Sequence, residues 1–177
     1  MTKYSKKILN IAKNIKLIAS DIDGVLTAGE IILLPDGNEL KIWNVKDGAG
    51  VSLIKRYLPE IKFVWITARK SKQVALRAKD LKIDILVQNC RDKKGEVLKI
   101  AKKNNIDISQ IAYIGDDVID LPALKIVGLS ACPFDAVDEV KKYSKYICNN
   151  CGGKGSFREI CDIILKAHKN VVDSYKP

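Results

Sequence analysis

The sequence predicts a three-layer α/β/α protein built on a parallel sheet, and three observations carry that prediction. Short apolar runs rich in β-branched residues alternate with amphipathic helical stretches along the chain. These runs are continuously apolar, which is typical of parallel strands buried between two helical layers. One segment, 30–45, breaks the alternation with two strand-like runs around the turn sequence PDGN.

The elements follow in order along the chain. The expected strands are 16–20, 62–67, 83–87, 111–115, 127–130 and 146–148. The expected helices have apolar residues at helical spacing and cover 49–57, 71–81, 93–104, 118–124, 136–143 and 156–169. A β-hairpin insertion is expected at about 29–45, with strands 30–34 and 39–45. Because this hairpin is too small to be a second domain, we expect one domain over 1–177, with the hairpin extending the sheet.

Composition sets limits on the class of protein. The 177 residues are 47% hydrophobic and 29% charged, which suits one globular core. No run of about 18 apolar residues is present, so no membrane span is expected. The basic N-terminal segment lacks the apolar core of a signal peptide, and we expect a cytoplasmic location.

The net charge of +10 raises the question of nucleic-acid binding. The lysines are scattered among helical segments and form no long basic block. This pattern favours a solvated surface over nucleic-acid binding, which stays as an alternative. Such a surface would also attract a small anionic substrate.

The five cysteines favour reduced thiols, because their number is odd and no signal peptide precedes them. Cys148 and Cys151 form a CxxC pair, with Cys161 and His168 downstream. The spacing matches no common zinc finger, so we expect unlinked structural cysteines, with a metal cluster as the alternative.

Polar side chains gather where four expected strands end. The first strand runs into SDIDG, the second into TAR, the third is followed by NCRDKK, and the fourth runs into GDD. Ligands of open α/β sheets sit beyond the carboxyl ends of the strands. These groups therefore converge if the first and fourth strands are neighbours.

The chemistry of these groups points to phosphoryl transfer from a phosphomonoester. Carboxylates held together repel unless a cation or proton relieves them, and Mg²⁺ prefers such oxygen ligands. A carboxylate can also be the covalent nucleophile that accepts a phosphoryl group. A lysine and a hydroxyl nearby are the expected partners of the phosphoryl oxygens.

Each of these features also has a purely structural interpretation. Thr67 could be the N-cap of the next helix. Asp92 could cap the helix after it, leaving Lys93 and Lys94 on a solvated face. Asp117 and Asp120 could be ordinary first-turn acids. The glycines of CGGKGS could simply form a tight turn, with Lys154 and Arg158 at its edge able to bind an anion.

In combination, the segments resemble the haloacid dehalogenase superfamily of phosphatases. DIDGV, ITAR, DKKGEV and IGDDVID follow in the order of its four motifs. The resemblance is closer to one subfamily, 3-deoxy-D-manno-octulosonate 8-phosphate phosphatase, through DGVLT, NVKDGAG, GDDVIDLPA and GGKGSFRE. It covers nearly the whole chain after about residue 15. It implies a Rossmann-like fold without a large cap domain, and a phosphoric monoester hydrolase of lipopolysaccharide biosynthesis.

The resemblance also implies roles for single residues. Asp21 would be the nucleophile, and Asp23 the general acid and then the base that activates water. Mg²⁺ would bind Asp21, Asp116 and the backbone carbonyl of Asp23, with Asp117 and Asp120 as supporting acids. Thr67 and Lys93 would hold the phosphoryl group. Lys93 matches the family's lysine better than Lys94 by its distance from Gly115, but the doublet leaves both open.

The implied assembly and substrate depend on less specific features. The family is usually a homotetramer in which neighbouring hairpins or tails help to close the site. The candidates for recognising the sugar-acid carboxylate are Arg69, Lys46, Lys154 and Arg158. Ser156 stands where the family usually has Ala, and Ala28, near the hairpin base, stands where it usually has Asp.

Besides nucleic-acid binding, these features leave three functions open. The first expectation is hydrolysis of 3-deoxy-D-manno-octulosonate 8-phosphate. Because of Ala28, the alternative is a nine-carbon substrate such as N-acylneuraminate or ketodeoxynonulosonate 9-phosphate. A non-catalytic oligomeric binding protein on the same fold is the third.

Overall fold

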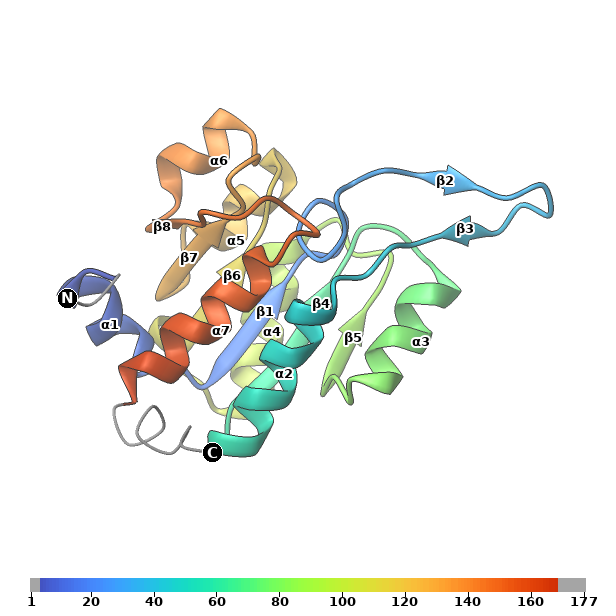
Figure 1. Ribbon diagram of the computed structural model, residues 1–177. Helices are drawn as coiled ribbons and strands as arrows, with labels where there is room; N and C mark the ends of the chain where they lie inside the picture. Colours follow the sequence, from blue (N-terminus) through green and yellow to red (C-terminus); the bar gives the residue numbers. More distant parts are fainter. Residues whose placement is uncertain (1–3, 169–177) are drawn as a thin grey trace.

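A computed structural model describes residues 4–168 and contains a six-stranded, fully parallel central sheet (Figure 1). Its strands are β1 (Leu17–Ser20), β4 (Lys62–Ile66), β5 (Ile85–Val87), β6 (Ile111–Ile114), β7 (Leu129–Cys132) and β8 (Tyr146–Ile147). The spatial order is β5-β4-β1-β6-β7-β8. The first and fourth of the expected strands, β1 and β6, are therefore neighbours, as convergence of the polar strand ends requires.

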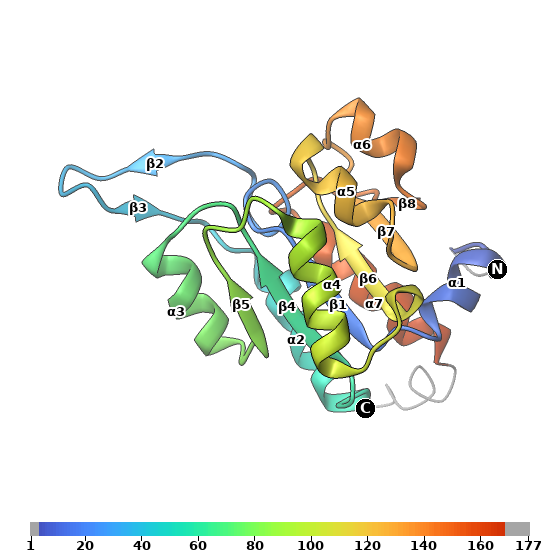
Figure 2. The ribbon, with the colours of Figure 1, turned by 180° about the vertical axis from the view of Figure 1, so that it is seen from behind.

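Helices cover both faces of the sheet. They are α1 (Lys6–Ala12), α2 (Val45–Tyr57), α3 (Lys72–Asp80), α4 (Lys93–Asn104), α5 (Leu121–Leu124), α6 (Asp138–Tyr143) and α7 (Ser156–Ala167), with 3-10 turns η1 (Ile108–Gln110) and η2 (Val118–Asp120). Helices α1, α2 and α7 lie on one face, and α4 and α5 on the other (Figures 1 and 2). Within residues 4–168, no helix has the length and apolar character needed to cross a membrane.

Two hydrophobic cores, one on each face, hold these layers together. Ile18 packs into the core under α1, α2 and α7, whereas its neighbours Leu17 and Ala19 pack into the core under α4 and α5. This division follows from the strand geometry, which points successive side chains to opposite faces. All four residues of β1, β6 and β7 are buried, so the expectation of strands buried on both faces is confirmed for the middle of the sheet, whereas the edge strands β5 and β8 are only partly buried.

Several boundaries differ from the sequence-based expectations for local reasons. Helix α2 begins at Val45 rather than at 49, because the Asn44 side chain accepts a hydrogen bond from the Lys46 N–H and caps it. The glycines of the first turns, which lower helix propensity, hide this start in the sequence. Strand β7 begins two residues late because Gly128 packs against the Ser109 carbonyl, where a Cβ would lie 1.8 Å from the oxygen.

The expected helices also differ from the structure. The short helix α1 was not expected; Ser5 caps it, and its residues Ile8 and Ala12 are buried. The stretch 118–124 is divided between η2 and α5, with a proline in the first turn of α5. The expected end of the last helix, Lys169, lies outside the described residues.

The inserted hairpin stands apart from the central sheet. Its strands β2 (Ile32–Leu33) and β3 (Glu39–Leu40) pair only with each other and project beyond the body of the molecule (Figure 1). The expectation that the hairpin extends the main sheet is therefore wrong. The turn itself matches its sequence: the Asp36 carboxylate accepts the Asn38 N–H at 2.9 Å, and Gly37 has a φ of +80°.

No disulfide joins any of the five cysteines, all of which lie within residues 4–168. Cys148 is buried, and its Sγ lies 3.5 Å from the Ser156 carbonyl oxygen. Among residues 4–168, the one cluster of His, Cys, Asp or Glu side chains with metal-ligand spacing contains aspartates alone. The described part of the chain therefore favours structural cysteines over a zinc cluster.

Candidate active site

The site is built where β1 ends beside β6. The Asp21 N–H donates to the Ile114 carbonyl at 3.0 Å and so continues the strand pairing by one residue. The chain then turns sharply, with the Ile22 carbonyl accepting from the N–H groups of the next turn. The Ile22 N–H in turn donates to Asp21 Oδ1 at 2.7 Å. The Ile22 N–H thus holds the Asp21 carboxylate in place at the carboxyl edge of the sheet.

Three carboxylates meet at this edge. One oxygen each of Asp21, Asp116 and Asp120 lies within 4.8 Å of the others. Gly24 makes room for them: its φ is +87°, and a Cβ there would lie 2.0 Å from Asp116 Oδ2. A side chain at position 24 would therefore be strained and would also displace an acid of the cluster.

A buried lysine neutralises part of this charge. Lys93 Nζ lies 2.8 Å from Asp21 Oδ2 and 2.7 Å from Asp120 Oδ1, and its side chain is 1% exposed. Lys93 opens α4, which Asp92 caps by accepting the Gly95 N–H at 2.9 Å. The capping role of Asp92 is confirmed, but only Lys94 is left exposed. Lys93 is thus the lysine that lies in the site.

Asp120 and Asp116 differ in how their oxygens are used. Asp120 Oδ1 accepts from Lys93 and from the Tyr113 hydroxyl at 2.7 Å, and Oδ2 accepts the backbone N–H groups of Asp116 and Asp117. In contrast, Asp116 Oδ1 is buried and has no hydrogen-bond partner among the described residues. A buried, unpaired carboxylate oxygen next to Asp21 fits a hard divalent cation. Both oxygens of Asp120 already accept hydrogen bonds, so Asp120 instead orients Lys93 and the backbone that carries Asp116.

The electrostatics of the cluster follow from its burial. Burial raises the pKa of Asp21 to about 7; the charge of Asp120 adds to this rise and Lys93 opposes it. Burial, together with the charges of Asp21 and Asp120, raises the pKa of Asp116 to about 8. Burial alone would lower the pKa of Lys93, but its contacts with Asp21 and Asp120 raise it overall. The site therefore favours an added positive charge or a proton.

We expect magnesium to stabilise the protein more at pH 8 than at pH 5.5. Because the folded-state pKa values of Asp21 and Asp116 lie well above the ordinary value of 3.8, these groups favour the folded state below about pH 4. That contribution is lost as the pH rises through 7 and 8, when the carboxylates ionise. Mg²⁺ binds the ionised form and competes with protons.

This expectation can be tested by thermal melting with and without MgCl₂ at both pH values. Without metal, the melting temperature should fall between pH 5.5 and pH 8, and Mg²⁺ should restore most of the loss. An equal Mg²⁺ effect at the two pH values would contradict it. Asp116→Asn, which removes the unpaired carboxylate, should reduce the Mg²⁺ effect at pH 8.

Two further predicted site residues, Thr67 and Asp117, have contacts of their own. Thr67 is buried directly after β4, and its Oγ1 accepts the Arg69 N–H at 3.2 Å. Ser71, not Thr67, stands at the N-cap of α3, so the capping alternative for Thr67 is wrong. Asp117 is exposed and is the N-cap of η2, accepting the Val118 N–H at 2.6 Å, rather than the first-turn acid considered for it.

The four predicted substrate-binding residues lie in two places. Lys46, Lys154 and Arg158 line one cavity of about 350 Å³ where α2 and α7 begin. Arg69 instead forms an ion pair with Glu39 of the hairpin. None of the clustered aspartates lines this cavity, but Lys154 also lines a second cavity, at the base of the hairpin, together with Ala28 and Lys41.

Sequence reasoning missed three residues of the site. Tyr113 is hidden in the apolar run of β6, although its hydroxyl donates to Asp120. Glu39 and Lys41 lie in the hairpin, and Lys41 forms an ion pair with Asp23. The alternation of charge at 39 and 41 along an expected strand was a signal that both side chains point to one side.

Comparison with known proteins identifies the family. Residues 41–155 match the family described as haloacid dehalogenase-like hydrolase. The chain belongs to this family. A curated relative, the 3-deoxy-D-manno-octulosonate 8-phosphate phosphatase of Escherichia coli (strain K12), is 37% identical over 92% of this chain and 86% of its own length.

Solved structures that are similar to this haloacid dehalogenase-like hydrolase include phosphatases of the same kind as its sequence relatives. The 3-deoxy-D-manno-octulosonate 8-phosphate phosphatase of Moraxella catarrhalis, in complex with magnesium, phosphate and KDO, superposes with a TM-score of 0.92. It is 38% identical, and the match covers 96% of this chain and 97% of that one. The cobalt-bound deoxy-D-mannose-octulosonate 8-phosphate phosphatase of Haemophilus influenzae has a TM-score of 0.87 at 32% identity, covering 94% and 96%.

These findings confirm the predicted fold of this hydrolase. The Rossmann-like, haloacid dehalogenase type of sheet is present, and the insertion between β1 and α2 is the hairpin, with no large cap domain among residues 4–168. The aspartate cluster offers carboxylate oxygens, which are ligands that magnesium prefers, and the Moraxella structure contains a magnesium ion.

Proposed function

We propose that this phosphoric monoester hydrolase cleaves a sugar-acid phosphomonoester, with 3-deoxy-D-manno-octulosonate 8-phosphate as the first-choice substrate. The observation that carries the proposal is the Asp21–Lys93 pair, buried beside an unpaired Asp116 carboxylate at the carboxyl edge of the sheet. A carboxylate, an ammonium and a divalent-cation site within one hydrogen-bonded cluster suit phosphoryl transfer. The curated relatives and several similar solved structures are named for this substrate.

The proposed reaction has two steps at Asp21. An Asp21 oxygen attacks the phosphorus, the bond from phosphorus to the sugar oxygen breaks, and Asp23 gives a proton to that oxygen. Asp23 then takes a proton from water as the water attacks the aspartyl phosphate, which releases inorganic phosphate and the Asp21 carboxylate. Thr67 and Lys93 hold the phosphoryl oxygens.

Magnesium, when bound, would offset the negative charge of the phosphoryl group. Asp21, Asp116 and the Asp23 backbone carbonyl are the proposed ligands. Asp120 and Asp117 support the site, Asp120 by accepting hydrogen bonds from Lys93 and from the backbone that carries Asp116.

The size of the sugar acid is the finer part of the proposal. Ala28, together with Lys41 and Lys154, lines a cavity of about 210 Å³ at the base of the hairpin. A small residue there enlarges the space that an aspartate would fill, and this keeps a nine-carbon sugar-acid phosphate as the second candidate. Arg69, Lys46, Lys154 and Arg158 are the proposed partners of the sugar-acid carboxylate.

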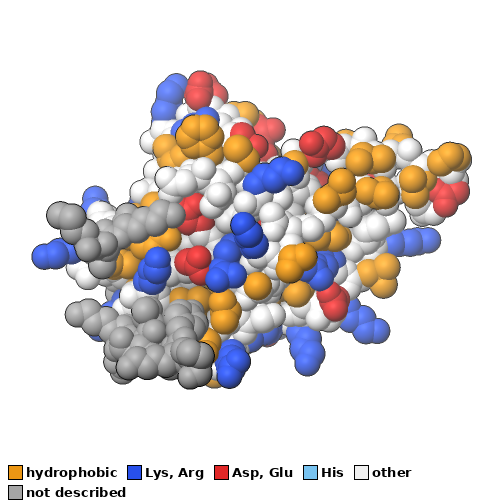
Figure 3. All heavy atoms as spheres, viewed as in Figure 1, with side chains coloured by type: hydrophobic (Ala, Val, Ile, Leu, Met, Phe, Trp, Pro, Cys, Tyr) orange, Lys and Arg blue, Asp and Glu red, His pale blue; other side chains and the backbone are white. Residues whose placement is uncertain are grey.

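The assembly we propose is a homotetramer joined through the hairpins. Large apolar side chains gather on the projecting hairpin (Figure 3), and the exposed ones are Ile31, Ile32, Leu33, Leu34, Leu40 and Ile42. Exposed apolar groups on a free strand pair are typical of an association surface. Sedimentation should show an assembly that Leu33→Lys with Ile42→Lys dissociates; an unchanged sedimentation coefficient would contradict this interface.

Phosphate release from a substrate panel tests the proposed function. The panel contains 3-deoxy-D-manno-octulosonate 8-phosphate, N-acylneuraminate 9-phosphate, ketodeoxynonulosonate 9-phosphate and simple hexose phosphates, each assayed with MgCl₂ and with EDTA. We expect Mg²⁺-dependent release, fastest with the eight-carbon acid. Faster release from a nine-carbon acid would select the second candidate. Binding of sugar acids without any release would favour a non-catalytic binding protein on this fold.

A further inference from the structure

The hairpin turns two charged side chains toward the site, although most of it is exposed. Glu39 lies in β3 and Lys41 directly follows this strand, and the two side chains point to the same side, with Lys41 Nζ 3.6 Å from Glu39 Oε2. The Lys41 side chain is only 3% exposed and that of Glu39 is 16% exposed. In contrast, the neighbouring Ile42 is 68% exposed. These two charged side chains are thus largely shielded from solvent, on a hairpin whose apolar side chains are exposed.

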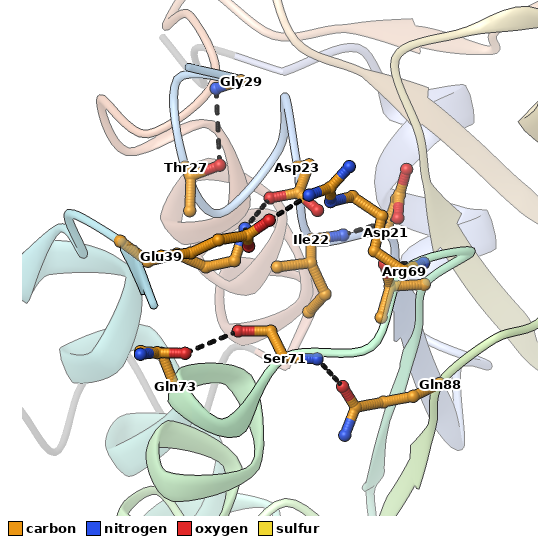
Figure 4. A network of polar contacts seen from close by, with 12 residues as sticks. Asp21, Ile22, Asp23, Thr27, Gly29, Glu39, Arg69, Ser71, Gln73 and Gln88 are labelled. Atoms are coloured by element: carbon orange, nitrogen blue, oxygen red, sulfur yellow. Dashed lines mark hydrogen bonds and ion pairs between the residues drawn. The ribbon is translucent and has the colours of Figure 1, made fainter. Parts of the chain in front are cut away.

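The two side chains belong to a line of alternating charges. Lys41 Nζ contacts Asp23 Oδ1 and lies 3.6 Å from Glu39 Oε2, and Glu39 Oε1 contacts Arg69. Figure 4 shows the side chains of Glu39 and Arg69 directed at each other beside Asp23. The line joins the turn after β1, the hairpin, and the segment after β4.

The contact fixes the Asp23 carboxylate. Among residues 4–168, Lys41 is the only side chain or backbone group that hydrogen-bonds or ion-pairs with it. A buried ammonium is retained only when it is paired, so Lys41 and Asp23 restrict each other's rotamers. Glu39 adds the second acid that faces Lys41 and is itself held by Arg69.

We propose that Lys41 is a positioning residue for proton transfer by Asp23, and that Glu39 positions Lys41. This inference rests on the proposed function, because it takes Asp23 as the group that protonates the leaving oxygen. Proton transfer depends on the distance and angle between donor and acceptor, and a carboxylate free to rotate is seldom aligned. The hairpin therefore contributes to the chemistry of the site through Lys41.

The test compares leaving groups. A sugar phosphate leaves as an alkoxide and needs the proton from Asp23, whereas p-nitrophenyl phosphate has a good leaving group and needs it far less. Lys41→Met, which keeps length but removes the charge, should lower kcat for the sugar phosphate by about 10- to 100-fold and change kcat for p-nitrophenyl phosphate much less. Lys41→Arg, which keeps the charge, should restore part of the loss. Lys103→Met, on the exposed end of α4, is the matched control.

The outcomes separate this inference from the proposed function. Asp23→Asn is measured in parallel; if it shows no leaving-group dependence, the proton-transfer role of Asp23 fails and the inference fails with it. If Asp23→Asn is leaving-group dependent but Lys41→Met slows both substrates equally or neither, the inference alone is overturned. Thermal melting checks that each variant is folded. Glu39→Gln, which keeps Lys41, should lower kcat less but with the same leaving-group dependence. If Glu39→Gln does not lower kcat in this way, the role given to Glu39 is overturned.

Discussion

Asp21→Asn is expected to abolish turnover while the protein stays folded. The amide oxygen can still accept the Ile22 N–H that holds this side chain, so the local turn is kept. What is lost is the oxygen that would attack phosphorus, since an amide is a poor nucleophile. Removing a covalent nucleophile lowers kcat by several orders of magnitude in comparable enzymes, and we expect a loss of roughly 10⁴-fold or more.

The stability of the same variant separates chemistry from folding. Burial raises the pKa of Asp21 to about 7, so its ionised form destabilises the folded, metal-free protein above that pH. The neutral amide removes this term, and the melting temperature at pH 8 without metal should stay within a few degrees of the wild type. Asp138→Asn, whose carboxylate is 84% exposed, is the matched control and should keep full activity. Undiminished phosphate release by Asp21→Asn would refute the proposed mechanism.

Lys93→Met should destabilise the protein and inactivate it together. Its ammonium pairs with both Asp21 and Asp120 in a site that is almost completely buried. Removing one partner of a buried ion pair costs about 3–5 kcal/mol, because the remaining carboxylates are left uncompensated. We expect a fall in melting temperature of roughly 10 °C at pH 8, and a loss of activity on the order of 10²- to 10³-fold.

The pH dependence of this loss identifies its cause. Lys93 opposes the rise in the pKa of Asp21, so without it the Asp21 carboxylate takes up a proton more readily, and the destabilisation should be smaller at pH 5.5 than at pH 8. Lys94→Met changes the exposed neighbour and should alter stability by no more than about 0.5 kcal/mol. If Lys94→Met were the more damaging variant, the assignment of Lys93 to the site would be wrong.

Much of the fold could be predicted because its signals are local. The apolar runs of β1, β4 and β6 and the helical spacing of α4 each lie within a dozen residues. Where the prediction of an element went wrong, a nearby group outweighed the pattern. The Asn44 cap starts α2 among glycines, and a close backbone contact delays β7 at Gly128. The role of the hairpin was mispredicted because pairing with the main sheet cannot be read from composition.

The sequence by itself determined that carboxylates, a hydroxyl and lysines stand at the ends of parallel strands, because strand periodicity and strand order suffice for that. Only the tertiary structure decided which of them meet. It placed Lys93 and not Lys94 between Asp21 and Asp120, filled both oxygens of Asp120 with donors, and brought Lys41 to Asp23. The contacts of Lys93 with Asp21 and with Asp120 join residues 72 and 27 positions apart in the chain, and the contact of Lys41 with Asp23 joins residues 18 positions apart. Such contacts depend on packing and desolvation across several elements, which a pattern of residue types along one segment does not contain.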